Sequence, residues 1–392
     1  MRNPARVVLV APLIAIVGPG AVAHGTGVSF VPLGDFSGGS FYSLGQNVSA
    51  DGSVVVGISD GALGLEAFRW TEVDGMIGLG DLPGGIFFSD GMGVSADGST
   101  VVGRSNSYYA SEGHHEAFRW TAATGIVGLG DFWGGWFSST ARAASADGSV
   151  AVGFGYHGGA GGYDREAFRW TEATGLVGLG YLSGSTKHSD AGAVSADGSV
   201  VVGRSMADLG GEAFRWTEED GMVGLGDLPG GEYSSTAYAV SADGQVVIGS
   251  SIVGIDPYGQ PKYEVFRWTE ADGMVGLGFY LGPENPHDVS ADGSVIVGEL
   301  WGNRPFVWDE VHGPRELETI LTEAGIDLTG WNLWTAYGVS ADGTTIVGSA
   351  CNPDGYLEAY VARIPEPATL ALLAMGLACA IPRRATRCPS PS

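Results

Sequence analysis

The apolar and polar positions of the chain follow a repeating order in which short apolar runs alternate with glycine-containing turns. The phrase Ser-Ala-Asp-Gly, followed directly by such a run, recurs at intervals of 46 to 50 residues. The runs, for example Val54-Val55-Val56, do not alternate with polar residues, which indicates strands buried on both faces. Asp-Gly predicts a type I′ hairpin turn, because both central residues of that turn need a positive φ. The seven copies begin at Ser49, Ser95, Ser145, Ser195, Ser241, Ser290 and Ser340.

The fifth copy shows how one unit is organised. A glycine-rich strand over 222–226 is followed by a strand of small residues over 237–241 and by the buried run 246–248. A Phe-Arg-Trp strand over 266–268 comes next, and the turn at Asp272-Gly273 leads into the glycine-rich strand of the following unit. Short connections join every adjacent pair of strands, so each unit is predicted to be a four-stranded antiparallel meander.

This period and strand count are those of a β-propeller blade, and we therefore predict an all-β, seven-bladed propeller. The small-residue strand should lie nearest the central axis, and the glycine-rich strand outermost. Side chains two residues apart share a strand face, so Phe and Trp should point together towards the neighbouring blade, with Arg opposite. The strand at 30–34 lacks a partner in its own unit, and we expect it to pair with the last strand, 358–363, and so close the ring.

The seventh unit contains a longer connection with a different periodicity. Apolar residues at Leu317, Ile320, Leu321 and Ala324, followed by Gly325, predict a short helix and its C-terminal cap.

The repeat resembles the HAF-type extracellular repeat of bacterial surface and secreted proteins. In that family a small-residue strand, a turn with glycine, a Val-Val-Gly strand and an Ala-Phe-x-Trp strand recur at this period. The resemblance covers residues 28–363. The turn here is Ser-Ala-Asp-Gly instead of the more usual Asn-rich form, which leaves a turn-specific ligand role open.

The two ends of the chain differ from the repeats, which divides the sequence into three parts. Residues 1–23 have a basic start, an apolar run and a small-x-small cleavage site, which predicts a removable signal peptide and a secreted protein. Residues 24–363 form the propeller. Residues 364–392 contain Pro365-Glu366-Pro367, an apolar stretch of about 15 residues that is short for a permanent transmembrane helix, and a basic end.

This tail resembles the PEP-CTERM sorting signal, which implies an exosortase-type transpeptidase as a partner. The matching residues are Pro365, Glu366 and Pro367 of the motif and Arg383 and Arg384 of the basic patch. The resemblance implies transient membrane anchoring before cleavage of the tail, and a final location in the bacterial cell envelope or extracellular matrix. The alternative is that the tail is a simple membrane anchor.

Charge and cysteine content exclude several classes of protein. The formal net charge of −25 argues against nucleic-acid binding, which needs clusters of Lys and Arg. The chain has only 3 Cys, two of them in the tail, so we expect no disulfide framework. We also expect no cofactor and no metal.

Motifs for catalysis and metal binding are weak. Gly57-Ile58-Ser59-Asp60-Gly61 matches G-x-S-x-G, but it ends a predicted strand without the helix that a nucleophile elbow needs. The aspartates of the seven turns could line a rim and bind Ca²⁺, although turn geometry alone explains Asp before Gly.

The histidines fall at unrelated repeat positions, and we expect them to be exposed in loops. We expect the repeated arginines to pair with nearby carboxylates. These arginines are Arg69, Arg119, Arg169, Arg215 and Arg267.

Aromatic residues outside the repeat pattern are the best candidates for ligand contact. They could stack on sugar rings or anchor a partner, or they could pack between blades. The candidates are Trp133, Trp136, Phe137, Phe87, Phe88, Tyr108 and Tyr109. The sequence thus predicts a non-enzymatic propeller that binds extracellular polysaccharide or another surface protein through variable loops. The alternative is a glycan-cleaving enzyme, which would need convergent carboxylates near the central channel.

Overall fold

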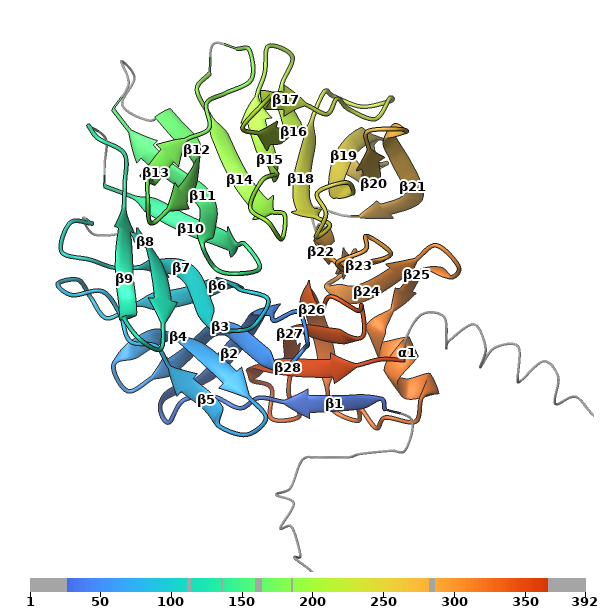
Figure 1. The fold of residues 1–392 in the computed structure, drawn as a ribbon. Coiled ribbons are helices and arrows are strands. Elements are labelled where there is room, and N and C mark those ends of the chain that lie inside the picture. Colours follow the sequence, from blue (N-terminus) through green and yellow to red (C-terminus); the bar gives the residue numbers. More distant parts are fainter. Residues whose placement is uncertain are drawn as a thin grey trace, which may run out of the picture.

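The computed structural model describes residues 27–110, 114–134, 137–158, 164–184, 186–281 and 286–365. These residues form seven four-stranded antiparallel sheets arranged around a common centre (Figure 1). The predicted seven-bladed propeller is therefore confirmed. The expected signal peptide at 1–23 lies outside the described residues, as does the tail beyond Pro365.

Each blade consists of consecutive strands, except the last, which also takes the first strand of the chain. Blades 1 to 3 contain β2 (Gly38–Val48), β3 (Val54–Gly61), β4 (Gly64–Thr71), β5 (Gly75–Gly78); β6 (Ser89–Val94), β7 (Thr100–Ser105), β8 (Glu116–Thr121), β9 (Gly125–Gly130); and β10 (Ser139–Ala144), β11 (Val150–His157), β12 (Asp164–Thr171), β13 (Gly175–Gly178). Blades 4 and 5 contain β14 (Ser189–Val194), β15 (Val201–Met206), β16 (Gly211–Thr217), β17 (Gly221–Gly224); and β18 (Ser235–Val240), β19 (Val247–Ile255), β20 (Pro261–Thr269), β21 (Gly273–Leu281). Blades 6 and 7 contain β22 (Pro286–Val289), β23 (Val295–Leu300), β24 (Arg304–Asp309), β25 (Gly313–Glu316); and β26 (Asn332–Val339), β27 (Thr345–Cys351), β28 (Leu357–Arg363), β1 (Ser29–Pro32).

The first strand of every blade is the innermost, as the small residues predicted. The inner strands β2, β6, β10, β14, β18, β22 and β26 contact one another around the ring. The glycine-rich strands, such as β5 and β9, are the outermost of their sheets. Small side chains at the centre allow seven strands to approach one axis.

The ring closes through the two ends of the propeller. Strand β1 pairs antiparallel with β28, with Ser29 opposite Arg363 and Pro32 opposite Tyr360. The pairing predicted for 30–34 and 358–363 is confirmed. This pairing covers the edge of β28, which would otherwise be open to pairing with another chain.

The hydrophobic core lies between blades and is divided into seven clusters, one in each interface. Between blades 1 and 2, Val54 and Val56 of β3 pack against Phe118 of β8, with Trp120 alongside. Val55, on the opposite face of β3, belongs to the interface with blade 7. The phenylalanine of each Phe-Arg-Trp strand is fully buried. A single blade therefore has no core of its own, and the blades stabilise one another.

A closed belt of backbone hydrogen bonds joins the seven Ser-Ala-Asp-Gly turns. The alanine N–H of each turn donates to the alanine carbonyl of the next, at 2.9 to 3.0 Å, and the N–H of Ala341 returns to the carbonyl of Ala50. The members of the belt are Ala50, Ala96, Ala146, Ala196, Ala242, Ala291 and Ala341. All seven blades are thus linked near the axis.

The predicted type I′ geometry of these turns is wrong. Gly52 has φ +72°, but Asp51 does not have a positive φ, since Asn303 is the one non-glycine residue with a positive φ in the described part of the chain. The N–H of Gly52 donates to the carbonyl of Ser49, so Ala50 and Asp51 occupy the central positions and Gly follows them. The loop is longer than the Asp-Gly dipeptide suggests, because Ser49 pairs with Val54.

The expectation that the repeated arginines pair with carboxylates is also wrong for three of them. The Nε of Arg69, Arg119 and Arg169 donates to the carbonyl of the turn glycine in the following blade, at 2.9 to 3.0 Å. A backbone carbonyl satisfies the guanidinium, so these arginines join blades.

The predicted helix in the seventh unit is confirmed as α1 (Leu317–Glu323), which buries Leu317, Ile320 and Leu321. Gly325 has φ +90° and donates its N–H to the carbonyl of Thr322, while Ile326 donates to Leu321. This is the Schellman arrangement that ends a helix at glycine.

Candidate functional site

The propeller has two faces with different construction. We call the face that contains the Ser-Ala-Asp-Gly turns and the Thr-x-x-(Asp/Thr)-Gly turns the turn face. The opposite side, which we call the loop face, contains the connections between the second and third strands of each blade and the crossovers between blades. Residues that differ from one repeat to the next are concentrated on the loop face and along the channel, and these are the places where a specific site can form.

One column of residues in the inner strands does not follow the repeat. It lies three residues before the serine of each Ser-Ala-Asp-Gly turn. Its members are Gln46, Met92, Arg142, Gly192, Tyr238, His287 and Tyr337. Arg142, Gly192, Tyr238 and His287 line a central cavity of about 170 Å³. This column was not predicted, although an alignment of the repeats on their turns shows it.

Four arginines of blades 2, 3 and 4 lie near the channel. Arg104 and Arg165 lie within electrostatic range of Arg142, which lines the cavity. Arg204 lies within range of Tyr238, another residue of the cavity lining. Arg142 belongs to the inner strand β10, Arg104 and Arg204 to β7 and β15, and Arg165 to β12. Arg165 and Arg142 flank the ring of Phe154, with their Cζ atoms 3.5 and 4.9 Å from its centroid. We call these four residues the arginine mouth.

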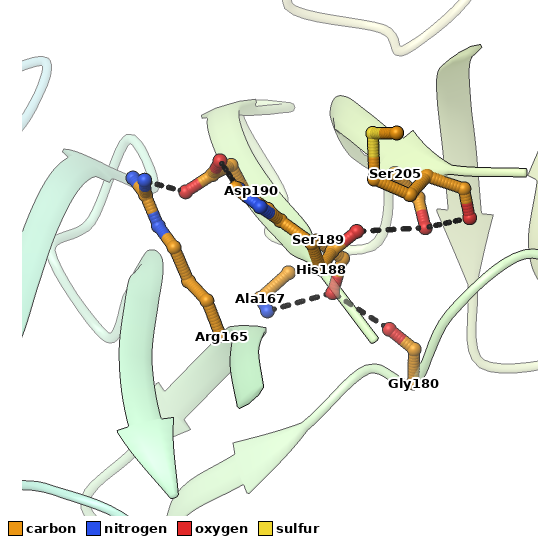
Figure 2. A network of polar contacts seen from close by, with 8 residues as sticks. Arg165, Ala167, Gly180, His188, Ser189, Asp190 and Ser205 are labelled. Atoms are coloured by element: carbon orange, nitrogen blue, oxygen red, sulfur yellow. Dashed lines mark hydrogen bonds and ion pairs between the residues drawn. The ribbon is translucent and has the colours of Figure 1, made fainter. Parts of the chain in front are cut away.

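Two of the four arginines have carboxylate partners. The Nη2 of Arg104 lies 3.1 Å from Oδ2 of Asp90, whose side chain is only 5% exposed. Arg165 forms an ion pair with Asp190, which also lies 2.9 Å from Nε2 of His188 (Figure 2).

The other two arginines have no such partner. Neither Arg142 nor Arg204 forms a hydrogen bond or ion pair with another residue in the described part of the chain, and the Nε of Arg204 is buried without an acceptor. Burial lowers the pKa of the Arg142 guanidinium. Asp190 lies within electrostatic range of Arg142 but forms its ion pair with Arg165, so Arg142 and Arg204 have no carboxylate in direct contact among the described residues.

The far side of the channel is acidic. Asp288 of β22 lines the cavity and accepts the N–H groups of Val289 and Val339, at 2.8 and 2.9 Å. Burial raises the pKa of its carboxyl to about 6. Next to it, Nε2 of His287 lies 3.4 Å from Oε1 of Glu299.

The structure brings three of the predicted aromatic residues together on the loop face. Tyr108 and Tyr109 contact each other with ring centroids 5.7 Å apart, and Tyr109 contacts Phe137 at 5.6 Å. Tyr108 is 79% exposed and Tyr109 70%, while Phe137 is half-buried. We call this trio, which joins blade 2 to the crossover before blade 3, the aromatic cluster.

The other predicted aromatic residues do not belong to the aromatic cluster, and they differ in how far they are buried. Phe88 is half-buried and stacks on His115 at 4.7 Å, with the guanidinium of Arg104 5.8 Å from its ring. Phe87 is half-buried, and Trp133 is 98% exposed. Trp136 lies outside the described residues.

A second exposed aromatic group, which was not predicted, lies on blades 5 and 6. Tyr280 and Trp301 line a hollow of about 300 Å³ together with Ile255. The Nζ of Lys262 lies 3.3 Å from the ring centroid of Tyr280. Ile255 and Tyr280 lie near the ends of β19 and β21, which are longer than the equivalent strands of the other blades, and Trp301 lies in the turn between β23 and β24.

The expectation of exposed loop histidines is wrong for the described ones, all of which are at least half-buried. His157 and His188 lie within 3.0 Å of carboxylates, and Nδ1 of His312 lies 2.9 Å from Asp309. Burial lowers the pKa of His115 to about 4. Acidic and aromatic neighbours hold these rings, which the sequence pattern did not reveal.

The serine of the G-x-S-x-G match has a structural role. Ser59 lies within β3 and is fully buried; its Oγ accepts the N–H of Phe36 and donates to the carbonyl of Tyr42, both at 3.0 Å. The equivalent Ser205 also donates to the backbone, at His188, as Figure 2 shows.

The turn aspartates likewise have a clear structural function. In the first turn Oδ1 of Asp51 accepts hydrogen bonds from the Oγ of Ser49 and the N–H of Ser53, at 2.7 and 3.0 Å. Hydrogen bonds of this kind lower the pKa of the aspartate in every turn, to about 2 for Asp97 and Asp197. Among the described residues, no group of three or more His, Cys, Asp or Glu side chains could hold a metal ion.

The recurring glutamate and serine residues, which the sequence analysis did not single out, fix the crossovers. Oε1 of Glu166 accepts the N–H of Gly180 at 2.9 Å. Ser189 of the next blade accepts the N–H of Ala167 and donates to the carbonyl of Gly180, at 2.9 and 2.7 Å (Figure 2). The same contacts recur in other blades, so the loop face stands on a repeated polar frame.

A groove of about 760 Å³ lies on the turn face across blades 3 to 5. Its lining includes Trp216, Trp268 and Arg215, together with Glu218 and Glu270. It is formed by repeated turn and strand residues and is acidic, in contrast to the arginine mouth.

Several expected features of the ends fall largely outside the described residues. Of the sorting residues, Pro365 is described, whereas Glu366, Pro367, Arg383 and Arg384 are not. Cys351 is free and half-buried. In the part of the chain that the structure describes, no helix is long and apolar enough to span a membrane.

Comparison with solved structures identifies propeller proteins. An oligogalacturonate lyase in complex with manganese is similar at 13% identity and a TM-score of 0.54, covering 88% of this chain and 96% of its own. The oligogalacturonate lyase from Vibrio parahaemolyticus is similar at 12% identity and a TM-score of 0.54, with 87% and 95% covered. No protein-family model and no curated protein matches the sequence. At these identities the likeness shows the propeller fold alone.

Proposed function

We propose that this protein is an exported, non-enzymatic propeller that binds extracellular polysaccharide or another surface protein through its loop face. The observation behind the proposal is the aromatic cluster, in which Tyr108, Tyr109 and Phe137 from two blades contact one another at the surface. Exposed tyrosines in contact present apolar ring faces beside hydroxyl groups, and such surfaces suit sugar rings or protein partners.

The setting of the cluster supports this function. Tyr108 and Tyr109 lie in a connection held by the hydrogen bond from the N–H of Tyr108 to the carbonyl of Pro83, at 2.9 Å. A Cβ added to Gly84 would lie 2.6 Å from Cβ of Tyr108, so the crossover packs tightly against this tyrosine. The rings are therefore positioned before a ligand arrives, which reduces the entropy lost on binding.

Export and sorting form the second part of the proposal. The leader over 1–23 and the tail with Pro365-Glu366-Pro367 resemble a signal peptide and a PEP-CTERM signal. An exosortase-type transpeptidase would then be the partner of the tail, and the propeller would be secreted to the cell envelope or extracellular matrix. The HAF-type resemblance of the repeats is consistent with this location.

A glycan array with the purified protein tests the binding function. We expect binding to at least one polysaccharide class, reduced about tenfold or more in the Tyr108→Ala/Tyr109→Ala double variant, since stacked aromatic contacts dominate such surfaces. Tyr258→Ala is the matched control, because Tyr258 is 86% exposed in a loop of blade 5 and lies outside the aromatic cluster. Equal binding by the double variant and the control would contradict the proposal.

A glycan-cleaving enzyme is the second candidate, and two observations favour it. The fold is shared with oligogalacturonate lyases, and the carboxyl of Asp288 has a pKa of about 6 in the channel, which suits acid–base catalysis. Against it, Asp90 and Asp190 are each bound to an arginine. Release of new chain ends from polysaccharides by the wild type, and its loss in Asp288→Asn, would favour the enzyme over the binding protein.

A further inference from the structure

We propose that the arginine mouth is a binding site for a carboxylate-bearing ligand, and that one terminal acidic unit of this ligand enters the central channel beside Arg142. The arginine mouth belongs to blades 2, 3 and 4, and none of its residues is part of the aromatic cluster. The proposal therefore stands or falls separately from the proposed function.

Positive charge is concentrated beside the channel. The chain has a net charge of −25 and few cations, yet Arg104, Arg142 and Arg165 lie within electrostatic range of one another. Asp90 and Asp190 form ion pairs with Arg104 and Arg165. Buried charges are normally paired, because an unpaired charge loses its hydration without compensation. Arg142 and Arg204 form no such ion pair in the described part of the chain, and a bound carboxylate would supply it.

Neighbouring side chains fix two of the guanidinium groups. Arg142 lines the cavity, and its guanidinium lies over the ring of Phe154. Arg165 packs on the same ring and is fixed further by its ion pair with Asp190. Rigidly held guanidinium groups suit planar carboxylates, which they bind through paired hydrogen bonds.

The size of the cavity limits the part of a ligand that can enter it. Glycine or alanine at positions 93, 143, 192 and 193 leaves a cavity of about 170 Å³. Sites for whole drug-sized ligands are about 300 to 1,000 Å³. Only one small acidic unit fits here, and the rest of a longer ligand would lie across the loop face.

The other groups that line the cavity are compatible with this ligand. Tyr238 offers a hydroxyl and Asn47 an amide. Asp288 faces the same cavity, but the N–H groups of Val289 and Val339 occupy its oxygens. A carboxylate can therefore bind at the arginine side while sugar hydroxyls contact the neutral groups.

Calorimetric titration with defined probes tests the site. The probes are a uronic acid trisaccharide, the same trisaccharide with its carboxyl groups reduced to alcohols, and citrate. We expect the acidic trisaccharide to bind and the reduced one to lose binding. Binding of citrate with equal affinity would identify a small polycarboxylate as the source of the carboxylate, whereas weaker citrate binding would identify the acidic sugar.

Substitutions then assign the interaction to the arginines. Arg142→Gln and, as an independent variant, Arg204→Gln should each weaken binding about ten- to a hundredfold, the range expected for a hydrogen bond to a charged group. Arg304→Gln is the control, because Arg304 pairs with Glu316 on an exposed part of blade 6. Melting curves verify that each variant is folded.

Three outcomes would overturn the proposal. They are a dissociation constant within twofold of wild type in both arginine variants, equal binding of the reduced trisaccharide, and failure of all three probes to bind. If Tyr109→Ala weakens trisaccharide binding and the arginine variants do not, the proposed function holds and this site is rejected. If only the arginine variants weaken it, the site holds and the role of the aromatic cluster is rejected.

Discussion

The turn face and the loop face are built by the same seven repeats, but they use acidic residues in opposite ways. On the turn face the aspartates are exposed and accept hydrogen bonds within their own turns, which lowers their pKa. In the crossovers of the loop face and in the channel, burial raises the pKa of Asp81, Asp131 and Asp288. At neutral pH the ionised turn aspartates therefore stabilise the folded protein, whereas ionisation of the buried carboxyls destabilises it.

The two faces also differ in what they carry beyond the contacts that join blades. The turn face joins blades through the alanine belt and through arginines that bind the next blade, and serines such as Ser189 join them at the crossovers. The loop face contains the aromatic cluster and the arginine mouth, whose exposed rings and unpaired guanidinium groups are not needed to hold the blades together. Stability and recognition are thus largely assigned to different faces, and four predictions test that separation.

The largest effect is expected for a glycine of the turn face. Gly148 has φ +65°, and a Cβ added there would lie 2.3 Å from Oγ1 of Thr100 in the preceding blade. Gly148→Ala should lower the free energy of unfolding by about 3 kcal/mol, since backbone strain and overpacking add together. Urea denaturation measures the change.

A glycine of the loop face provides the matched control. Gly259 has φ +82° with nothing within 4 Å, so Gly259→Ala adds the backbone strain alone. We expect a loss of about 1 kcal/mol. Similar losses for the two variants would show that contact between blades at the turns is unimportant.

The pH dependence of stability should show a maximum near pH 4. The pKa of Asp97 and Asp197 is about 2 in the folded protein, so the stability they contribute is lost as pH falls from about 4 to 2. Asp288 and Asp131 have raised pKa values, about 6 and 7, so folding binds protons and stability falls as pH rises from about 4 to 7. Melting temperatures measured from pH 2 to 8 test both limbs.

The two limbs of this profile can be separated by substitution. Asp131→Asn/Asp288→Asn should remove much of the decline between pH 4 and 7 while leaving the acid limb in place. An unchanged decline in this double variant would mean that self-repulsion of the net negative charge, and not these two buried carboxyls, causes it.

A smaller effect is expected for the arginines that join blades. Arg169→Ala removes the hydrogen bond from Nε to the carbonyl of Gly198, at 3.0 Å, and should cost about 1 kcal/mol in thermal or urea unfolding. Arg304→Ala removes an exposed ion pair on blade 6 and should cost less, about 0 to 1 kcal/mol. The reverse order would contradict the assignment of stability to the turn face.

The smallest change in stability is expected for the aromatic cluster. Tyr109 is 70% exposed, so Tyr109→Ala should alter the free energy of unfolding by no more than about 0.5 kcal/mol. A loss above about 2 kcal/mol would indicate that the cluster holds blades 2 and 3 together and serves the fold more than recognition.

Much of the fold could be predicted from the sequence because every repeat contains the same pattern of strands and turns. The number of blades, the inner position of the small-residue strands and the closure of β1 on β28 all follow from that repetition. The geometry of the turns could not be predicted, because it depends on the pairing of Ser49 with Val54, which the Asp-Gly dipeptide does not specify. The partner of Arg169 could not be predicted either, since it is a backbone carbonyl of another blade.

The candidate site was only partly predictable, for a related reason. Tyr108, Tyr109 and Phe137 were found because they depart from the repeat, but their contact depends on how two connections fold against each other. Arg142 and Arg204 come from different strands of different repeats, and each alone is an ordinary residue. The packing of blade 4 on blade 3 determines which charges lie near them.

The last strand of the propeller also fixes an orientation. Beyond Arg363, the N–H of Ile364 donates to the carbonyl of Thr344, which follows the last Ser-Ala-Asp-Gly turn, so the polypeptide leaves the ring on that side. Ser29 lies opposite Arg363, and the chain therefore enters from the same side. A molecule tethered to the cell surface by its tail would stand with its uniform side towards the membrane and its variable side outwards, where a passing polymer first meets it.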